Sequence, residues 1–223
     1  MKKKAIVVGA TGLIGGFCVQ ELLINSRYAQ VLVLTRKPLR IKHPKLKHLV
    51  VDFDHLERVA PQLKANDIFC CLGTTRKKAA TPEAYRKIEF EYAFKIARMT
   101  LKNKAEKFLI VSSVGADANS RYFYLQLKGE IEEVVSALPF KAVHLFRPSF
   151  IMGENDRRER RPSEAVLEGI LKPLSFLFIG PLRKYRPIAG KTIARAMVKA
   201  ANSNLQGVHI WESNLIEDLD TGN

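Results

Sequence analysis

Tyr124 and Lys128 stand four residues apart, a spacing that could let the two side chains move a proton together. On a helix, residues four apart lie on one face, so the phenol and the ammonium would be neighbours. A phenol has an unperturbed pKa of about 10. A nearby positive charge favours the phenolate and brings this pKa toward the working range of an acid-base catalyst. By itself the spacing is common, and it usually marks a helix with a buried tyrosine and a solvated lysine.

Ser112 and Ser113 come before this helix, directly after an apolar run at residues 108–111. At the end of a strand, a serine hydroxyl could hydrogen-bond a substrate oxygen and stabilise the negative charge that develops on it. Together with a glycine turn near the start of the chain, the serine pair raises the Tyr124 and Lys128 spacing from a chance pattern to a strong indication of a reaction site.

Three glycines, Gly9, Gly12 and Gly15, follow the apolar run at residues 5–8 and open a helix. Gly9 permits a sharp turn, Gly12 removes a side chain where the backbone must meet a pyrophosphate, and Gly15 lets the helix pack on the strand. The phosphate would rest on the helix N-terminus. The glycine spacing of three and three differs from the common dinucleotide fingerprint. A glycine turn with a purely structural role is therefore the alternative.

The next apolar run, residues 31–34, is followed by Thr35, Arg36 and Lys37. An acidic residue at this place in a dinucleotide-binding fold would hold the ribose 2′-hydroxyl of NAD, whereas a guanidinium offers paired donors to a 2′-phosphate. We therefore expect NADP(H) as the cofactor, with Arg36 and Lys37 at its 2′-phosphate. The alternative is that both residues belong only to the exposed basic segment that follows.

Two further strand ends are expected to meet the cofactor. Asp52, in the run at residues 49–53, could receive the adenine amino group, and capping a helix is its alternative role. Leu72 and Gly73 lie at the end of the run at residues 68–72 and would pass beneath the cofactor. The missing side chain of Gly73 would allow a close approach there.

Seven apolar runs alternate with stretches of helical periodicity along the chain. The expected strands are residues 5–8, 31–34, 49–53, 68–72, 108–111, 142–146 and 208–211. Their hydrophobicity is continuous rather than alternating, which indicates strands buried on both faces of a parallel sheet. The helical stretches between them include residues 14–23, 85–99 and 131–138. This order predicts an α/β protein with a doubly wound parallel sheet, the Rossmann fold, whose ligands bind outside the carboxyl ends of the strands.

With 223 residues and 47% hydrophobic content, the chain suits a single globular domain over residues 1–223. After residue 147 the pattern becomes irregular, and we expect residues 148–190 to form a small C-terminal insertion that covers the substrate. It holds a helical stretch at residues 163–171 and an apolar stretch at residues 174–182 that is too short to cross a bilayer. A surface excursion or a subunit contact is the alternative role for this insertion.

The net charge of +15 limits the kinds of binding partner, and the three cysteines indicate the redox compartment. The basic clusters at residues 37–47 and 157–161 are not interleaved with aromatics, so we expect no nucleic-acid partner, and the charge would instead attract a phosphorylated dinucleotide. Cys18, Cys70 and Cys71 lack metal-ligand spacing and indicate a reducing cytoplasm. We expect no metal site and no transmembrane segment.

Several motifs together resemble a known superfamily. They are the glycine turn at residues 9–15, the serine pair at 112–113, the segment at residues 124–128 and the dipeptide at 147–148. This set resembles the short-chain dehydrogenase/reductase superfamily, in its atypical branch. More narrowly, residues 70–76, 113–117 and 124–130 resemble the Tat-interacting, metastasis-suppressor-type oxidoreductases of eukaryotes and their bacterial relatives. The resemblance spans nearly the whole chain.

That family binds NADPH, and the resemblance implies which residues would hold it here. They are Thr11, Gly12, Leu13 and Ile14 at the phosphate turn, Arg36 and Lys37 at the 2′-phosphate, Leu72 and Gly73 beside the cofactor, Ile151 at the nicotinamide pocket and Arg161 as a phosphate clamp. Tyr124 and Lys128 would be the catalytic pair and would also contact the cofactor. Of the two serines, Ser113 would act, because the superfamily usually uses the second of such a pair.

We therefore expect an NADP(H)-dependent oxidoreductase that moves a hydride between nicotinamide and a small-molecule carbonyl or alcohol substrate. Tyr124 would give or take the proton, Lys128 would tune the phenol, and Ser113 would hold the substrate oxygen. The alternative is a regulatory or redox-sensing protein that binds NADPH without turnover and acts through a protein partner. We expect a monomer or a homodimer.

Overall fold

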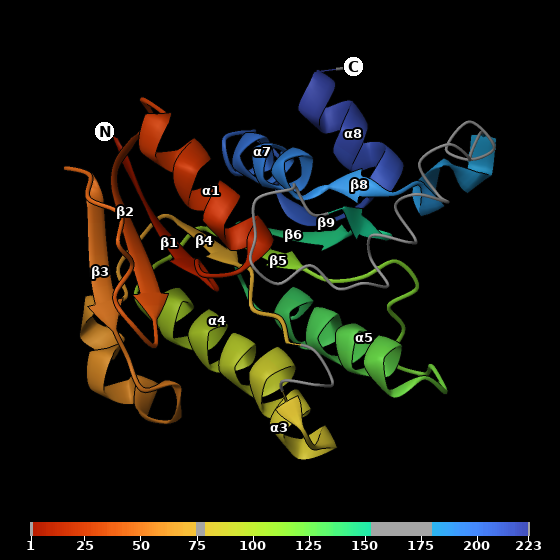
Figure 1. Cartoon of the computed structure of the whole chain (residues 1–223), viewed down its shortest axis with the longest axis horizontal. Helices are drawn as coiled ribbons and strands as arrows, with labels where there is room; N and C mark the ends of the chain where they lie inside the picture. Colours follow the sequence, from red (N-terminus) through yellow and green to blue (C-terminus); the bar gives the residue numbers. More distant parts are fainter. Residues whose placement is uncertain (1, 75–78, 153–179, 223) are drawn as a thin grey trace.

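A parallel sheet of seven strands forms the centre of the protein (Figure 1). The computed structural model describes residues 2–74, 79–152 and 180–222. The strands of this sheet are β1 (Lys3–Val8), β2 (Tyr28–Thr35), β3 (Leu46–Val50), β4 (Asp67–Cys70), β5 (Lys107–Val111), β6 (Ala142–Arg147) and β9 (Gly207–Glu212). Their order is β3-β2-β1-β4-β5-β6-β9, and each neighbouring pair is parallel. The strand order reverses between β1 and β4, the place where doubly wound sheets bind their ligands.

The seven predicted apolar runs are the seven strands of this sheet, so the predicted fold is confirmed. All residues of β4 and β5 are buried, because helices cover both faces of the sheet. Two expected strands run past their observed ends. The run at residues 68–72 continues beyond β4, which ends at Cys70, and the run at residues 49–53 continues beyond β3, which ends at Val50 before Phe53 begins the 3-10 helix η1 (Phe53–Gln62). β3 lies at the edge of the sheet with mixed burial, so the apolar pattern marks its end poorly.

Helices form a layer on each face of the sheet, as Figure 1 shows. One layer consists of α1 (Leu13–Ile24), α7 (Gly190–Ala201) and α8 (Ser213–Thr221). The other consists of α3 (Pro82–Arg86), α4 (Tyr92–Lys102) and α5 (Phe123–Ser136). Each layer encloses its own apolar core against its face of the sheet. This covering leaves the ends of the strands as the places where a site can form.

The helical stretch predicted over residues 85–99 contains an irregular turn. A π-helical turn, η2 (Lys87–Glu91), joins α3 to α4. The wider turn changes which side chains face the sheet. The predicted apolar face runs through Ile88, but in the structure Ile88 is half-buried and the neighbouring Glu89 is buried.

Much of the predicted substrate-side insertion lies outside the described residues, including the helical stretch at 163–171 and residues 174–179 of the apolar stretch. The described part contains the short strands β7 (Ile151–Met152) and β8 (Ile188–Ala189), which pair in parallel, and the 3-10 helix η4 (Gly180–Tyr185). The role of this insertion stays a prediction. Among the described helices, none has both the length and the apolar character needed to cross a bilayer.

Candidate cofactor and catalytic site

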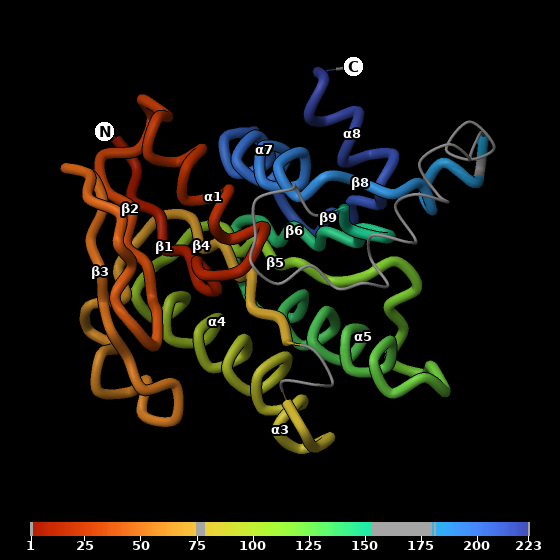
Figure 2. The backbone as a smooth tube through the Cα atoms, in the orientation of Figure 1, coloured from red at the N-terminus to blue at the C-terminus, as the bar shows by residue number. Residues whose placement is uncertain are grey.

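The turn between β1 and α1 packs against the end of β4, as the backbone trace in Figure 2 shows. Gly9 has a φ of 81°, and a Cβ at this position would lie 2.2 Å from the carbonyl oxygen of Cys71. A Cβ on Gly15 would lie 2.3 Å from the carbonyl oxygen of Gly9. The protein itself therefore excludes side chains at both positions, because the turn, α1 and β4 approach one another so closely.

Gly12 and Gly73 have more open surroundings. The nearest neighbour of a Cβ on Gly12 would be the Gly9 carbonyl oxygen at 3.1 Å, and a Cβ on Gly73 would meet Glu89 Oε1 at an ordinary 3.7 Å. Gly12 is also the N-cap of α1 and has no side chain that could cap it. A helix N-terminus of this kind suits a phosphate, because its N–H groups and its dipole both favour negative charge. Glycine at these two positions fits a ligand that comes close to the backbone.

Other predicted cofactor residues follow β2 and β3. Arg36 and Lys37 are exposed directly after β2. Thr35, the last residue of β2, is buried, and its hydroxyl has no hydrogen-bond partner within the described ranges. Such a group suits a place that a ligand completes. Asp52 accepts a hydrogen bond from the backbone N–H of Asp54 at 3.0 Å, so its helix-capping alternative is observed and its contact with adenine stays a prediction.

Helix α5 brings Lys128 to the end of β5. Lys128 Nζ donates to the carbonyl oxygen of Val111 at 3.0 Å and lies 2.8 Å from Glu89 Oε2. The lysine side chain is only 6% exposed. Burial lowers the pKa of Lys128, but the charges of Glu89 and Tyr124 raise it, and the net shift is upward. Lys128 is therefore a buried ammonium held at a strand end, rather than the solvated lysine that its spacing alone would suggest.

Tyr124 lies on the same face of α5 and is half-buried. Its ring meets that of Tyr85 edge to face, with ring centroids 6.3 Å apart. Both rings belong to a small apolar cluster with Ala79 and Leu127. The phenol is close enough to Lys128 to contribute to the raised pKa of that ammonium. The structure thus brings together the two side chains whose spacing first indicated a reaction site.

The serine pair follows β5 at the same edge of the sheet. The backbone N–H of Ser112 donates to the carbonyl oxygen of Phe146 at 2.6 Å, and its buried hydroxyl has no partner in the part of the chain that the structure describes. Ser113 is half-buried, and its hydroxyl donates to the carbonyl oxygen of Val114 at 3.3 Å. Ser113 is therefore the more accessible of the two hydroxyls.

Two residues of this site, Glu89 and Gly129, were not predicted from the sequence. Glu89 follows Tyr85 by four residues on a face that is otherwise apolar, and a carboxylate at such a position is the signal that could have found it. A Cβ on Gly129 would lie 2.0 Å from the backbone nitrogen of Ala118, so the loop after β5 packs directly on α5. A glycine inside a helix costs about 1 kcal/mol relative to alanine, which hints at such a contact.

The last predicted contacts come from the C-terminal insertion. Ile151 in β7 is half-buried and packs against the core on the α1 side of the sheet. Arg161 lies outside the described residues, so its role as a phosphate clamp stays a prediction. Within residues 2–74, 79–152 and 180–222, no cluster of three or more histidine, cysteine or acidic residues could hold a metal ion.

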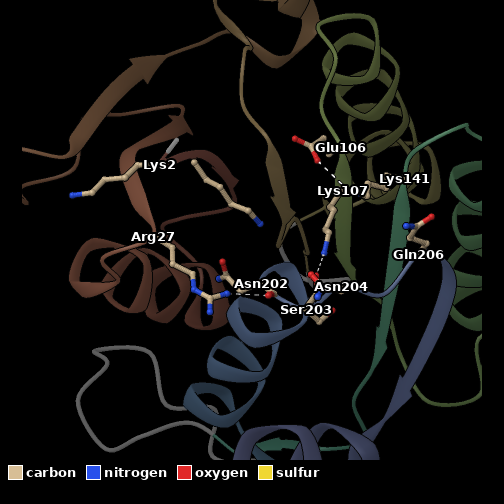
Figure 3. Close-up of a pocket in the computed structure, with 10 residues that line it drawn as sticks. Lys2, Arg27, Glu106, Lys107, Lys141, Asn202, Ser203, Asn204 and Gln206 are labelled. Atoms are coloured by element: carbon tan, nitrogen blue, oxygen red, sulfur yellow. Dashed lines mark hydrogen bonds and ion pairs between the residues drawn. The ribbon is translucent and has the colours of Figure 1, made fainter.

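A pocket of about 440 Å³ opens at the opposite edge of the sheet, at the amino ends of the strands (Figure 3). Basic side chains dominate its lining, namely Lys2, Lys3, Arg27, Lys107 and Lys141. Dinucleotides bind at the carboxyl ends of the strands in this class of fold. This pocket is therefore separate from the predicted cofactor site.

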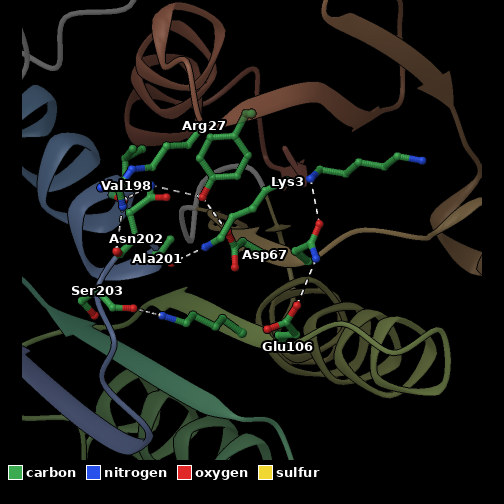
Figure 4. A network of polar contacts seen from close by, with 12 residues as sticks. Lys3, Arg27, Asp67, Glu106, Val198, Ala201, Asn202 and Ser203 are labelled. Atoms are coloured by element: carbon green, nitrogen blue, oxygen red, sulfur yellow. Dashed lines mark hydrogen bonds and ion pairs between the residues drawn. The ribbon is translucent and has the colours of Figure 1, made fainter. Parts of the chain in front are cut away.

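Three of these cations bind the C-terminal end of α7; Figure 4 labels Lys3 and Arg27, and Figure 3 labels Lys107. The donors and the carbonyl oxygens are Lys3 to Ala201 at 2.7 Å, Arg27 to Asn202 at 3.0 Å and Lys107 to Ser203 at 2.5 Å. Cations at a helix C-terminus satisfy its last carbonyls and its partial negative charge. The basic cluster therefore has a structural role in holding α7 against the sheet.

Comparison with protein families and relatives agrees with this geometry. Residues 9–142 match a family model described as NAD(P)H-binding. Protein HTATIP2 of Rattus norvegicus is 34% identical over 166 residues, which cover 73% of this chain and 67% of the relative. The protein named fmp52, mitochondrial, of Aspergillus niger is 33% identical over 208 residues, which cover 90% of this chain and 88% of the relative. Because this relative is named mitochondrial, the cytoplasmic location inferred from the cysteines stays a prediction.

Solved structures share the fold at low sequence identity. The ADP-L-glycero-D-manno-heptose-6-epimerase of Helicobacter pylori has a TM-score of 0.70 and 16% identity, with coverage of 100% of this chain and 81% of the epimerase. The Bordetella bronchiseptica enzyme WbmH, solved with NAD+, has a TM-score of 0.69 and 16% identity, with coverage of 99% and 80%. At such identities the likeness shows the fold alone. The family match, the relatives and the Rossmann architecture together show that this chain belongs to the NAD(P)H-binding family, within the atypical short-chain dehydrogenases/reductases.

Proposed function

We propose that this protein is an NADP(H)-dependent oxidoreductase that interconverts a carbonyl compound and the corresponding alcohol. The observation that carries the proposal is the position of Lys128. Its ammonium is buried, lies 3.0 Å from the Val111 carbonyl oxygen and neighbours Tyr124, at the same sheet edge as the glycine turn. A buried ammonium beside a half-buried phenol is the arrangement that acid-base chemistry by tyrosine requires.

The residues after β1 and β2 would hold the cofactor. The N–H groups of Leu13 and Ile14 at the start of α1 would bind the pyrophosphate, while the Gly12 N–H donates to the Gly9 carbonyl oxygen at 2.8 Å and shapes the turn. Arg36 and Lys37 would bind the 2′-phosphate, and the position of a guanidinium there, directly after β2, supports NADP(H) over NAD(H). The cofactor, when bound, supplies the hydride.

The side chains of the chain itself would manage the proton. In the reducing direction, Tyr124 gives its phenolic proton to the substrate oxygen, and Lys128 stabilises the phenolate that remains. An ammonium has three N–H donors. Lys128 donates one of these to Val111 and forms an ion pair with Glu89, and we assign a remaining donor to the nicotinamide ribose. Ser113 would donate a hydrogen bond to the substrate oxygen.

Cofactor binding and turnover test this proposal together. Fluorescence titrations with NADPH and NADH should show tighter binding of NADPH, and NADPH oxidation should depend on an added aldehyde, ketone or quinone from a panel. If the protein fails to bind either nucleotide, the cofactor assignment is wrong. If it binds NADPH but oxidises it with no member of the panel, the regulatory or redox-sensing alternative, with a protein partner, becomes the better account.

A further inference from the structure

Glu89 contacts Lys128 directly, yet the proton transfer described above gives it no role. Its side chain is 3% exposed, and its Oε2 lies 2.8 Å from Lys128 Nζ. Its other oxygen, Oε1, accepts a hydrogen bond from the backbone N–H of Thr74 at 2.7 Å. Thr74 follows Gly73, at the strand end expected beneath the cofactor. One carboxylate therefore links the lysine of the reaction pair to the cofactor side of the site.

The π turn η2 gives Glu89 this inward position. The turn spans Lys87–Glu91 between two stretches of regular helix, and Glu89 is its buried residue. Single π turns are rare and frequently occur at functional sites. Here the turn directs a carboxylate, instead of the neighbouring Ile88, toward the end of β4.

Stability alone accounts poorly for a buried charge pair at this place. Removing an ammonium and a carboxylate from water offsets most of their attraction, so an apolar pair of similar volume often serves stability as well or better. The Glu89 and Lys128 pair is nearly enclosed, with side-chain exposures of 3% and 6%. An electrostatic effect of the pair on the Tyr124 phenol explains its burial better than stability does.

The charges around Tyr124 show what that effect would be. Lys128 faces the phenol from α5, and Tyr85 faces it from α3. Near Lys128, burial raises the pKa of the Cys70 thiol to about 12, and a hydrogen bond to Cys18 together with burial raises that of Cys71. Both thiols are thus uncharged at neutral pH. Glu89 is the negative group in the described residues that lies in contact with Lys128 and opposes its charge at the phenol.

We propose that Glu89 is a positioning residue that holds the Lys128 ammonium at Tyr124 and sets the pH at which the phenol ionises. This inference rests on the proposed function, because it takes Tyr124 and Lys128 as the reaction pair. The Glu89 carboxylate opposes part of the positive charge that Lys128 presents to the phenol. The hydrogen bond from the Thr74 backbone N–H fixes the same carboxylate to the segment that follows β4, which is expected to lie beside the cofactor.

The substitution Glu89→Gln separates charge from shape. A glutamine keeps the length of the side chain and its oxygen can still accept from Thr74, but it removes the negative charge. The Lys128 ammonium then acts on Tyr124 unopposed, and the phenol should ionise at a lower pH than in the unmodified protein. Glu130→Gln is the matched control, because Glu130 is a carboxylate of α5 that pairs with Arg86 of α3 at 2.6 Å.

The measurement is a pH titration of phenolate absorbance. The absorbance of Tyr124→Phe is subtracted from that of the unmodified protein, and the absorbance of Glu89→Gln/Tyr124→Phe from that of Glu89→Gln, so that each difference reports Tyr124 alone. We expect the midpoint of Glu89→Gln to lie below that of the unmodified protein and the midpoint of Glu130→Gln to be unchanged. An unchanged midpoint overturns the inference. If Glu89→Gln does not fold, Glu89→Asp keeps a charge but lengthens the ion pair, and its midpoint should move down by a smaller amount. Equality of the Glu89→Asp and unmodified midpoints would then overturn it.

This titration needs neither substrate nor cofactor, so it fails or succeeds independently of the proposed function. A protein that oxidises NADPH through Tyr124 but shows no midpoint change in Glu89→Gln would retain the proposed function and lose this role for Glu89. A midpoint change in a protein with no turnover would leave the role of Glu89 intact as a property of the site and contradict the reaction.

Discussion

The ammonium of Lys128 lies 3.0 Å from the carbonyl oxygen of Val111, which ties the helix of the reaction pair to the last residue of the strand that leads into the serine pair. The contact crosses from α5 to β5 and is buried. It explains how residues 112–113 and Tyr124 come to one edge of the sheet, although the chain between them is irregular. The positions of these groups therefore depend on one another through Lys128.

Removing Lys128 alone should destabilise the protein. Lys128→Met leaves the Glu89 carboxylate buried without a positive charge beside it, and breaking a buried pair in this way costs about 3 kcal/mol or more in free energy of unfolding. The double variant Lys128→Met/Glu89→Leu removes both charges and should recover most of that loss. Urea denaturation at neutral pH measures the free energies. A double variant as unstable as Lys128→Met would show that the loss comes from packing and not from the unpaired carboxylate.

The glycines of the site should separate into those that the fold requires and those that face the cofactor. Gly15→Ala should lower the free energy of unfolding by about 2 kcal/mol or more, because its Cβ would lie 2.3 Å from a backbone oxygen. Gly73→Ala should leave stability nearly unchanged, since its nearest contact is 3.7 Å away, but it should weaken NADPH binding. Thermal denaturation and NADPH titration of both variants make the comparison. Tight NADPH binding by Gly73→Ala would contradict the predicted close approach.

Arg36 should discriminate between the two nicotinamide cofactors. A charge-assisted hydrogen bond is worth about 1.5–3 kcal/mol, so Arg36→Ala should weaken NADPH binding roughly 10- to 100-fold. NADH binding should change little. Arg40→Ala, an exposed arginine in the same basic segment, is the control for a general loss of charge. Equal losses of affinity for NADPH and NADH would contradict the assignment of Arg36 to the 2′-phosphate.

His144 should make stability depend on pH. Burial first, and then His209 and Lys107, lower the pKa of His144 to about 3, and its Nδ1 accepts a hydrogen bond from Trp211 at 3.2 Å. Between the unfolded pKa of about 6.5 and this folded value, the unfolded chain binds more protons, so stability falls as pH falls. Over the whole interval between the two pKa values, the contribution is on the order of 5 kcal/mol. His144→Gln should flatten the dependence of the unfolding free energy on pH between about 6 and 4. An equally steep dependence in the variant would assign it to other groups.

The apolar runs predicted the sheet well because parallel strands are buried on both faces and leave a continuous hydrophobic pattern. Helix boundaries were harder. A π turn has no simple periodic signature, so the inward position of Glu89 could not be read from a spacing that points to Ile88. The capping contact of Asp52 depends on where β3 ends, and an edge strand with mixed burial marks this end weakly.

The reaction pair was predictable because its spacing is local, whereas its surroundings come from distant parts of the chain. Tyr124 and Lys128 lie within one helix. The side chains that act on them, Glu89 and Tyr85, come from the segment before β5, and the Val111 carbonyl is a backbone group with no sequence signal. Only the fold brings these groups together.

NADPH oxidation by Tyr124→Phe, compared with the unmodified protein on the same panel of carbonyl compounds, tests the central claim most directly. Tyr122→Phe is the matched control, because Tyr122 is 75% exposed and lies just before α5. The account predicts that Tyr124→Phe binds NADPH normally but loses about 10²- to 10⁴-fold in turnover, while Tyr122→Phe keeps it. Turnover by Tyr124→Phe equal to that of the unmodified protein would contradict the assignment of Tyr124 as the proton donor.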